Sequence, residues 1–380
     1  MDYRTRIVSS LAEIGQSRWD KLLATQEEAN PFLSYAFLHA LHESGSACDQ
    51  TGWEPHYLSL WLDDVLVAAM PLYRKFHSYG EYVFDWAWAE AYQRHGVEYY
   101  PKLLSAIPFT PVRGARLLAV DDSARSALLA ALQELQQAPG HSSTHILYPP
   151  PDQAEMLAEA GFLLRSGVQF HWRNEGYASF AEFVDTLDRK KRKNILAERR
   201  KVTEQGIRFV SLRGSEIGEQ HWRFFNRCYR HTYSAHYSTP YLNLDFFQRI
   251  GQSMPQHLLL TLALRGDQPI ASSLTVHDQD TLYGRYWGAL EHVPCLHFET
   301  AYYQPLEFCI AEKITWFEGG AQGEHKMARG FLPQKTWSAH WLAHPGFYDA
   351  VEHFLAREGG GIDGYMSELN ERNPFRHPLP

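Results

Sequence analysis

The sequence predicts an α/β protein of two tandem halves, each with a mixed sheet flanked by helices. Strand-like apolar runs alternate with amphipathic helical segments along the chain. The length of 380 residues exceeds the size at which one core usually stops growing. Segments of the first half also recur, in the same order, in the second half.

The first recurring segment is a proline turn that leads into a helix. NPFLSYAFLHALHESG begins at Asn30, and TPYLNLDFFQRIGQSM begins at Thr239. Pro31 and Pro240 are 209 positions apart, and several apolar residues behind them keep that spacing. The inner face of the first helix is expected to carry Phe37, Leu38 and Leu41.

The second recurring segment is a β-hairpin. HYLSLWLDDVLVAAMPLY turns at Asp63-Asp64, and HLLLTLALRGDQPIASSLTV turns at Gly266-Asp267. Asp64 and Asp267 are 203 positions apart, and the same spacing relates Tyr99-Tyr100 to Tyr302-Tyr303. The drop from 209 to 203 indicates a longer loop in the first half, which we assign to SGSACDQTGWEP.

The remaining elements complete two halves, which we place at residues 1–175 and 176–380. After its hairpin the first half is predicted to form a strand at 116–120, a helix at 123–137, a strand at 144–148, a helix at 152–160 and a strand at 168–172. The second half opens with one long helix that Gly206 ends. Its later part is predicted to form a strand at 282–287, a helix at 300–313, a strand at 314–317 and a glycine-rich loop at 319–326.

Composition narrows the class of protein. A formal charge of −8 argues against a general nucleic-acid coat. The four cysteines show no CxxC spacing, which favours a reducing compartment. No window approaches about 18 uninterrupted apolar residues, so no transmembrane segment is expected. We therefore expect a cytoplasmic protein.

Polar residues are concentrated in the segment 281–329. Ligand sites in α/β folds lie at the carboxyl ends of strands and at the adjacent helix termini. We therefore expect one pocket to gather the polar residues of this segment, namely Arg285, His297, Glu299, Gln322, Glu324, His325, Lys326 and Arg329.

These motifs resemble those of a known family. The two halves, with "AEAGF" near the end of the first, resemble the GNAT acyltransferase fold. The basic helix RKKRKNILAERRKVTEQGI resembles a segment of the Fem-type enzymes, tandem GNAT proteins that add amino acids to peptidoglycan precursors. LYGRYWG, LHFETAYYQ, FEGGAQGEHK and RGF resemble a family of N-acyltransferases termed peptidoglycan biosynthesis or recognition proteins. The resemblance implies tandem GNAT-like domains with the main site in the second.

The sequence departs from the acyl-CoA-dependent members of that fold at one turn. Those enzymes usually carry an (Arg/Gln)-x-x-Gly-x-(Gly/Ala) turn whose backbone N–H groups cradle the pyrophosphate. No such turn precedes Tyr99 or Tyr302. The missing turn leaves room for a different acyl donor, so acyl-coenzyme A and charged tRNA are both candidate co-substrates. No tightly bound cofactor is expected.

Acyl transfer to an amine needs a base, donors for the oxyanion and a site that holds both substrates. We assign the base to His325 or Glu324, since the glycine-rich loop leaves both accessible. A solvated tight turn is the alternative for this loop. The expected substrate contacts are Arg285, Tyr286, His297, Glu299, Gln304, Gln322, Lys326 and Arg329.

Two groups of these residues allow more than one interpretation. On a strand, Cys295, His297 and Glu299 would share a face and resemble a metal site, but the spacing is weak and we expect no metal. Strict alternation would place Tyr283, Arg285 and Trp287 on one face of their strand. Arg285 is then expected to meet either a protein carboxylate or an anionic substrate.

The basic helix is either a solvated face or a phosphate-binding surface, with Lys191, Arg192 and Arg199 as the phosphate-binding candidates. The sequence as a whole predicts an N-acyltransferase that moves an acyl or aminoacyl group to a small-molecule or cell-wall-precursor amine. The alternatives are a non-catalytic protein that binds cell-wall fragments, and a metal-dependent hydrolase that uses Cys295, His297, Glu299 and His325.

Overall fold

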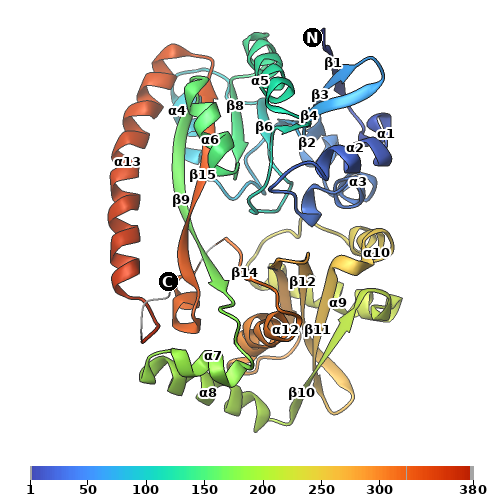
Figure 1. Ribbon diagram of the computed structural model, residues 1–380, viewed down its shortest axis with the longest axis vertical. Helices are drawn as coiled ribbons and strands as arrows, with labels where there is room; N and C mark the ends of the chain where they lie inside the picture. The colour runs from blue at the N-terminus through green and yellow to red at the C-terminus, as the bar shows by residue number, and fades with distance from the viewer. Residues whose placement is uncertain (1, 322, 377–380) are drawn as a thin grey trace. The chain divides into compact units, whose positions relative to one another are not determined.

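The computed structural model (Figure 1) describes residues 2–321 and 323–376. The chain forms two compact units: unit 1 comprises Met1–Gly167 and Lys335–Gly364, and unit 2 comprises Val168–Gln334 and Tyr365–Pro380. These units differ from the predicted halves 1–175 and 176–380, because residues 335–364 return to unit 1. The chain passes between the units inside a strand, β9, a second strand, β15, and a helix, α13.

Unit 1 contains two groups of strands. The first has the order β1-β3-β4-β7 and consists of β1 (Arg4–Val8), β3 (Tyr57–Leu62), β4 (Val65–Met70) and β7 (Leu118–Ala119). The second has the order β15-β8-β6-β5-β2 and consists of β2 (Trp53–Pro55), β5 (Tyr73–Lys75), β6 (Lys102–Ser105), β8 (Ser143–Leu147) and the part of β15 (Leu332–Leu342) that lies in unit 1. Strand β8 is parallel to β6 and antiparallel to β15.

Helices pack on the strands of unit 1. They are α1 (Leu11–Ile14), α2 (Gln16–Leu23), α3 (Tyr35–Glu43), α4 (Trp86–Arg94), α5 (Asp122–Gln137), α6 (Pro151–Glu159) and the first part of α13 (Pro345–Glu371). As predicted, Phe37, Leu38 and Leu41 form the buried face of α3. Leu128 and Leu132 of α5 belong to the same buried apolar cluster as Leu58 of β3.

Unit 2 has one mixed sheet. Its order is β10-β11-β12-β13-β14-β9, and its strands are β10 (Ile207–Arg213), β11 (Leu258–Arg265), β12 (Gln268–His277), β13 (Thr281–Ala289), β14 (Trp316–Glu318) and the end of β9 (Leu163–Arg173). Only β13 and β14 run parallel among these pairs. The helical segments are α7 (Phe180–Thr186), α8 (Arg189–Thr203), α9 (Glu219–Ala235), α10 (Leu244–Ser253), α11 (Leu296–Phe298), the π-helix η5 (Glu299–Tyr303), α12 (Gln304–Glu312) and the 3-10 helix η6 (Glu324–Arg329).

Two of the three equivalences predicted for the repeat are confirmed, those of the hairpins and of the helices that follow a proline turn. Both predicted hairpins form, as β3-β4 and β11-β12, and each contains a register shift, between Leu60 and Trp61 in the first and between Ala263 and Leu264 in the second. These shifts keep the spacing of 203 positions. The helices α3 and α10 begin after Ser34 and Asn243, whose side chains accept backbone N–H groups in the first turn.

One predicted equivalence is wrong. Tyr302 and Tyr303 lie in the π-helix η5, whereas Tyr99 and Tyr100 lie in coil before β6. The order of elements shows that α5, between β7 and β8, corresponds to the helical segment between β13 and β14. Residues between β4 and β7 form β5, α4 and β6, which have no counterpart at that place in unit 2.

The long basic helix predicted at the start of the second half is divided. Helix α7 ends at Thr186 and α8 begins at Arg189. Leu187 has an extended backbone, is fully buried and forms a bridge with Phe375. Burial of this single side chain therefore overrides the continuous helical pattern. Within the described part of the chain, no helix is long and apolar enough to cross a membrane.

Candidate active site

The candidate site begins where β13 and β14 separate. The two strands pair only from Thr281 with Trp316 to Tyr283 with Glu318. On its other edge β13 contains a bulge, because Leu274 of β12 faces Tyr286 while Thr275 faces Gly284, which leaves Arg285 as the extra residue. The glycine-rich loop that follows β14 begins beside β13, since a Cβ atom on Gly320 would lie 3.6 Å from the carbonyl oxygen of Gly284.

The bulge corrects the predicted alternation. Leu282 and Trp287 lie on the same face, because both belong to apolar clusters that include α8 residues. Tyr286 faces the other way, toward Tyr229 and Phe247 of α9 and α10. The guanidinium of Arg285 lies 5.2 Å from the Tyr286 ring centre. Tyr283, Arg285 and Trp287 therefore do not share a face, since the extra residue reverses the alternation.

The segment that follows β13 is helical, not extended. Cys295 has a left-handed backbone, with φ of 67°, and precedes α11. The π-helix η5 then inserts an additional residue before α12, whose second residue is Pro305. Cys295, His297 and Glu299 consequently do not line one face of a strand, and the prediction of a shared strand face is wrong.

Two histidines and a tyrosine meet beside Phe298. The ring centre of His297 lies 5.5 Å from that of Tyr302, and His325 lies 6.0 Å from Tyr302. The Tyr302 hydroxyl is 3.4 Å from Nε2 of His325. Phe298 contacts both imidazoles, with ring centres 5.5 Å and 5.9 Å away.

Two buried cations lie in the same turn as His325. Nζ of Lys326 donates to the carbonyl oxygen of Gly320 at 2.9 Å, so it is directed at the glycine-rich loop. Arg329 donates to the carbonyl oxygen of His325 at 2.8 Å and to both carboxylate oxygens of Glu198. Its guanidinium lies 3.4 Å from the Phe298 ring centre. Arg329 thus links the backbone of the loop to Glu198 of α8.

Burial lowers the pKa values of the ionisable groups in this cluster. It lowers the pKa of His297 to about 4 and also lowers the pKa of His325, which Lys326 and Arg329 depress further. Both imidazoles are therefore neutral at pH 7. Burial lowers the pKa of Lys326 to about 8, so its amine stays mainly protonated at pH 7 but is close to its titration.

Glu324 is held away from this cluster. Its carboxylate accepts hydrogen bonds from the Tyr365 hydroxyl of α13 at 2.7 Å and from Arg372, just beyond the end of that helix, at 3.1 Å. The hydrogen bond from Tyr365 lowers the pKa of Glu324. An exposed, paired carboxylate of low pKa is a poor base, so of the two predicted bases the geometry favours His325.

Glu299 and Gln304 are hydrogen-bonded to other side chains of the protein. Arg199 of α8 donates to Glu299 at 2.9 Å and to Glu307 at 2.7 Å. Gln304 donates to Glu299 at 2.9 Å. The Arg199 guanidinium also lies 4.5 Å from the Phe180 ring centre. This network fixes α8 against η5 and α12, and it leaves Arg199 engaged by carboxylates where a phosphate contact was predicted.

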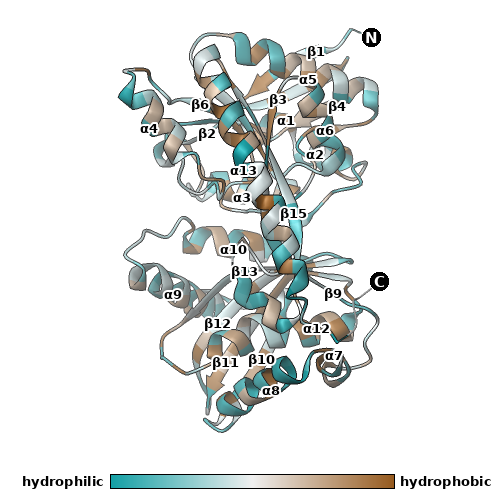
Figure 2. Ribbon diagram, turned by 90° about the vertical axis from the view of Figure 1, so that its left-hand side faces the viewer, coloured by the Kyte–Doolittle hydropathy of each residue, from teal (hydrophilic) through white to brown (hydrophobic). Residues whose placement is uncertain are grey.

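The rest of α8 keeps a basic outer face. Arg192 pairs with Asp185 at 3.0 Å, and Lys191 is partly buried. A shallow depression of about 340 Å³ is lined by Arg189, Arg192, Lys193, Leu196, Ala197 and Arg200. Figure 2 shows that this helix is largely hydrophilic. Lys191 and Arg192 thus remain candidates for phosphate contact, while Gln322 lies outside the described residues.

Sequence reasoning missed a buried polar network in unit 1. Lys102 is fully buried and pairs with Glu81 at 2.8 Å and with Asp85. Tyr99 donates to Asp85 at 2.7 Å and is 3.1 Å from Nε2 of His145. Lys102 begins the apolar run KLLSAIPF, and this position was the feature of the sequence that could have indicated a buried lysine. This network is enclosed, so we assign it a structural role.

The network extends to a histidine from the last strand. Nδ1 of His145 is 2.8 Å from Nδ1 of His340, and Nε2 of His340 is 2.8 Å from the Ser338 hydroxyl. Burial lowers the pKa of His145 to about 3 and that of His340 well below its usual value. The two residues are 195 positions apart, so no local pattern could pair them.

The residues around the site fit neither a metal ion nor the pyrophosphate of coenzyme A. Among residues 2–321 and 323–376, no group of three or more His, Cys, Asp or Glu side chains is arranged to hold a metal ion. The segment between β13 and α11 has no glycine, carries Glu291, and ends with Pro294, which has no N–H, and Cys295. It therefore does not fit the pyrophosphate of coenzyme A.

Comparison with known proteins agrees with this architecture. A profile of the FemAB-like family, described as peptidoglycan biosynthesis/recognition, matches residues 10–377. No curated protein matches the chain. The crystal structure of FemX is similar, with a TM-score of 0.55 and 11% identity over 93% of this chain and 100% of FemX.

Two further solved structures are similar over most of their length. L-PGS from Bacillus licheniformis has a TM-score of 0.53 and 10% identity, over 89% of this chain and 96% of its own. A conserved protein of unknown function from Bacteroides thetaiotaomicron has a TM-score of 0.50 and 11% identity, over 88% of this chain and 99% of its own. The predicted fold class, tandem halves with mixed sheets flanked by helices, is confirmed.

Proposed function

The chain belongs to the FemAB-like family, and on that premise we propose that it transfers an acyl or aminoacyl group from an activated ester to an amine. The observation that supports this proposal is the cluster of His325, Lys326, Tyr302 and His297 where β13 and β14 separate. It joins a neutral imidazole, a protonated amine and a loop of small residues at a strand end. Those are the parts that acyl transfer requires.

In this proposal the acceptor nitrogen forms the new C–N bond while the C–O bond of the donor ester breaks. His325 accepts the proton that leaves the acceptor nitrogen and returns it to the departing donor oxygen. Lys326 donates to the oxyanion that develops on the carbonyl. Tyr302 holds the imidazole by its hydroxyl, 3.4 Å from Nε2. These groups are positioned by hydrogen bonds within the protein, from Arg329 to the backbone of His325 and from Gln304 to Glu299.

We propose charged tRNA as the donor and a cell-wall precursor amine as the acceptor, both in the cytoplasm. The poor fit of the β13 to α11 segment to a pyrophosphate speaks against acyl-coenzyme A. The outer face of α8 supports a polyanionic donor, since Arg189, Lys190 and Lys193 are exposed on it. The family description agrees with a cell-wall acceptor.

The proposal is tested by single substitutions in a transfer assay. The full chain is incubated with a lysine-containing cell-wall precursor peptide and either tRNA charged with radiolabelled amino acids or radiolabelled acetyl-coenzyme A. We expect transfer from the tRNA, and we expect His325→Gln to lower kcat by about 100-fold or more. Glu324→Gln and the exposed His236→Gln serve as matched controls and should retain activity.

Three outcomes would count against parts of the proposal. Full activity of His325→Gln would reject the base. Transfer from acetyl-coenzyme A alone would reject the donor. Tight binding of the precursor peptide without turnover of either donor would favour the non-catalytic alternative, a protein that only binds cell-wall fragments.

A further inference from the structure

One cavity of unit 2 lies at the opposite end of the sheet from His325. It has a volume of about 680 Å³, within the range of small-molecule sites. Leu258 begins β11, His277 ends β12 and Glu312 ends α12, so the cavity lies where β13 and β14 begin. The proposed reaction centre lies at the other ends of these two strands. The cavity is therefore a separate site.

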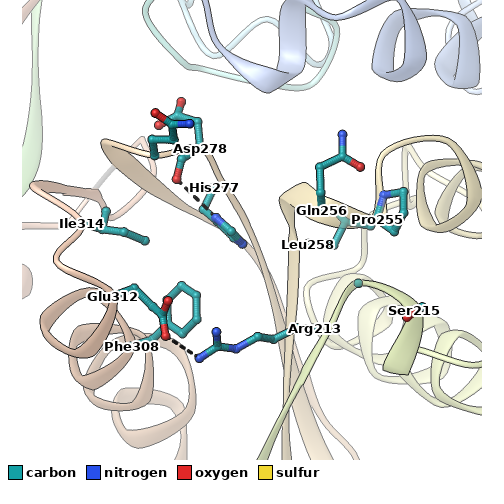
Figure 3. A pocket seen from close by; sticks show the side chains of 12 residues that line it. Arg213, Ser215, Pro255, Gln256, Leu258, His277, Asp278, Phe308, Glu312 and Ile314 are labelled. Atoms are coloured by element: carbon teal, nitrogen blue, oxygen red, sulfur yellow. Dashed lines mark hydrogen bonds and ion pairs between the residues drawn. The ribbon is translucent and has the colours of Figure 1, made fainter.

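Its floor is apolar and its wall carries an accessible ion pair. Leu258, Phe308 and Ile314 supply the apolar surface. Arg213 stacks its guanidinium 4.7 Å from the Phe308 ring centre and donates to Glu312 at 2.8 Å. Figure 3 shows Arg213, Glu312 and His277 directed at the same space.

This ion pair can exchange its partner for a ligand. The side chains of Arg213 and Glu312 are 53% and 41% exposed, and ion pairs of this exposure contribute little to stability. The stacked guanidinium uses one nitrogen for Glu312, and its planar fork keeps further N–H donors that match a carboxylate. Glu312 in turn offers a carboxylate to an ammonium group.

His277 adds a neutral acceptor. Its Nδ1 donates to the carbonyl oxygen of Asp278 at 3.3 Å, and burial lowers its pKa, so Nε2 is left as an acceptor. The Asp278 carboxylate is already used by the backbone N–H groups of Asp280 and Thr281. Asp278 also lines the cavity, which therefore presents one guanidinium, two carboxylates and one neutral acceptor above an apolar floor.

We propose that this cavity binds a short zwitterionic peptide, with its carboxylate on Arg213, its ammonium on Glu312 and an apolar side chain on Phe308 and Ile314. One guanidinium beside two carboxylates suits a zwitterion better than a phosphate, which Glu312 and Asp278 would repel. The site goes beyond the proposed transfer reaction, because it uses none of the residues of that reaction.

Calorimetric titration of the full chain with the dipeptide Leu-Leu tests the proposal. We expect saturable binding that weakens by about tenfold or more when the dipeptide is N-acetylated, when its carboxylate is amidated, or in Arg213→Ala. Arg265→Ala is the matched control, since Arg265 forms a similarly exposed ion pair with Glu291 in the same unit. His325→Gln should bind the dipeptide as tightly as the parent.

A double variant separates loss of binding from loss of folding. Arg213→Glu combined with Glu312→Arg retains a pair of opposite charges but reverses its direction, and we expect it to lose affinity without losing the fold. No heat of binding, or equal affinity for the zwitterion and its blocked forms, would overturn the proposal. Weakened binding in His325→Gln but not in Arg213→Ala would instead place the dipeptide at the reaction centre.

Discussion

At the scale of single residues, Gly323 sets the position of the proposed base. Its φ is +118°, a conformation that residues with a side chain rarely adopt. A Cβ atom at this position would lie 2.4 Å from Cε1 of His325, so any side chain would push the imidazole away. The glycine is thus needed beside the histidine and not only as a flexible link in the loop.

The protonation states of His325 and Lys326 predict a bell-shaped dependence of kcat/KM on pH. The base must be neutral, so activity is lost as pH falls below the pKa of His325, which burial holds under 6.5. Lys326 must be protonated, so activity is lost as pH rises above about 8. Initial rates measured from pH 5 to 10 check both limbs.

Lys326→Arg separates the two limbs. Because a guanidinium keeps its proton throughout this range, the variant should lose the alkaline limb and keep the acid limb, whatever its absolute rate. An unchanged alkaline limb in this variant would assign that titration to another group.

The buried imidazole pair of unit 1 predicts that stability falls in acid. The pKa of His145 is lowered to about 3, so below pH 6.5 the unfolded chain takes up protons that the folded chain excludes. Each such imidazole costs about 1.4 kcal/mol per pH unit below its unfolded pKa. Denaturant unfolding between pH 7 and 5 should show this slope.

Two double variants test the origin of that slope. Replacing His145 and His340 with glutamine should flatten it. Replacing the exposed His231 and His236 in the same way should leave it unchanged. Equal slopes in both double variants would show that other groups dominate the acid response.

At the scale of elements, Arg199 fixes α8 to η5 and α12. Arg199 bonds to Glu299, which is 3% exposed, and to Glu307. Glu299→Gln should lower the free energy of unfolding by about 2 kcal/mol, because it removes the buried one of the two carboxylates that pair with the Arg199 guanidinium. Glu291→Gln, at an exposed pair with Arg265, should change it by less than about 0.5 kcal/mol.

The transfer rate distinguishes the two roles considered for Glu299. If it only positions α8, the rate of Glu299→Gln well below its unfolding midpoint should stay near that of the parent chain. A large loss of kcat in a folded variant would show that Glu299 contacts the reacting groups directly.

The sequence predicted those elements that depend on neighbouring residues. Both hairpins and α3 and α5 were predicted, because alternation, turn residues and helical spacing act over a few positions. The break at Leu187 and the bulge at Arg285 were not predicted, since each depends on packing against distant residues. The contact between His145 and His340 could not be predicted for the same reason.

The candidate site was predicted in part. The glycine-rich loop pointed to His325 and Lys326, which the structure brings together with His297. Glu324 and Arg329, from the same loop, turned out to face Tyr365 and Glu198. A loop pattern identifies which residues are close, but the direction of each side chain depends on α8 and α13.

At the scale of the whole molecule, unit 1 depends on residues far along the sequence. Strand β8 pairs with β15 from Ser338 to Leu342. A fragment of residues 1–175 lacks this strand and His340, and we expect it to show no cooperative unfolding transition. Joining residues 335–364 to the fragment through a Gly/Ser linker should restore the transition, as monitored by circular dichroism.

Restored cooperativity in the joined fragment but not in the short one would confirm that unit 1 includes the later segment. A cooperative transition in residues 1–175 alone would show that β15 adds little to the unit, and would support the simpler division at residue 175.

The late position of β15 has a consequence for biosynthesis. Most of unit 1 is translated first. Its strand β8, however, cannot pair with β15 until residues 338–342 have been made, and these follow all the strands of unit 2. The part of the protein made first is therefore among the last to be completed. A premature stop codon before these residues would damage the amino-terminal unit, and the nascent chain would expose the edge of β8 throughout the synthesis of unit 2.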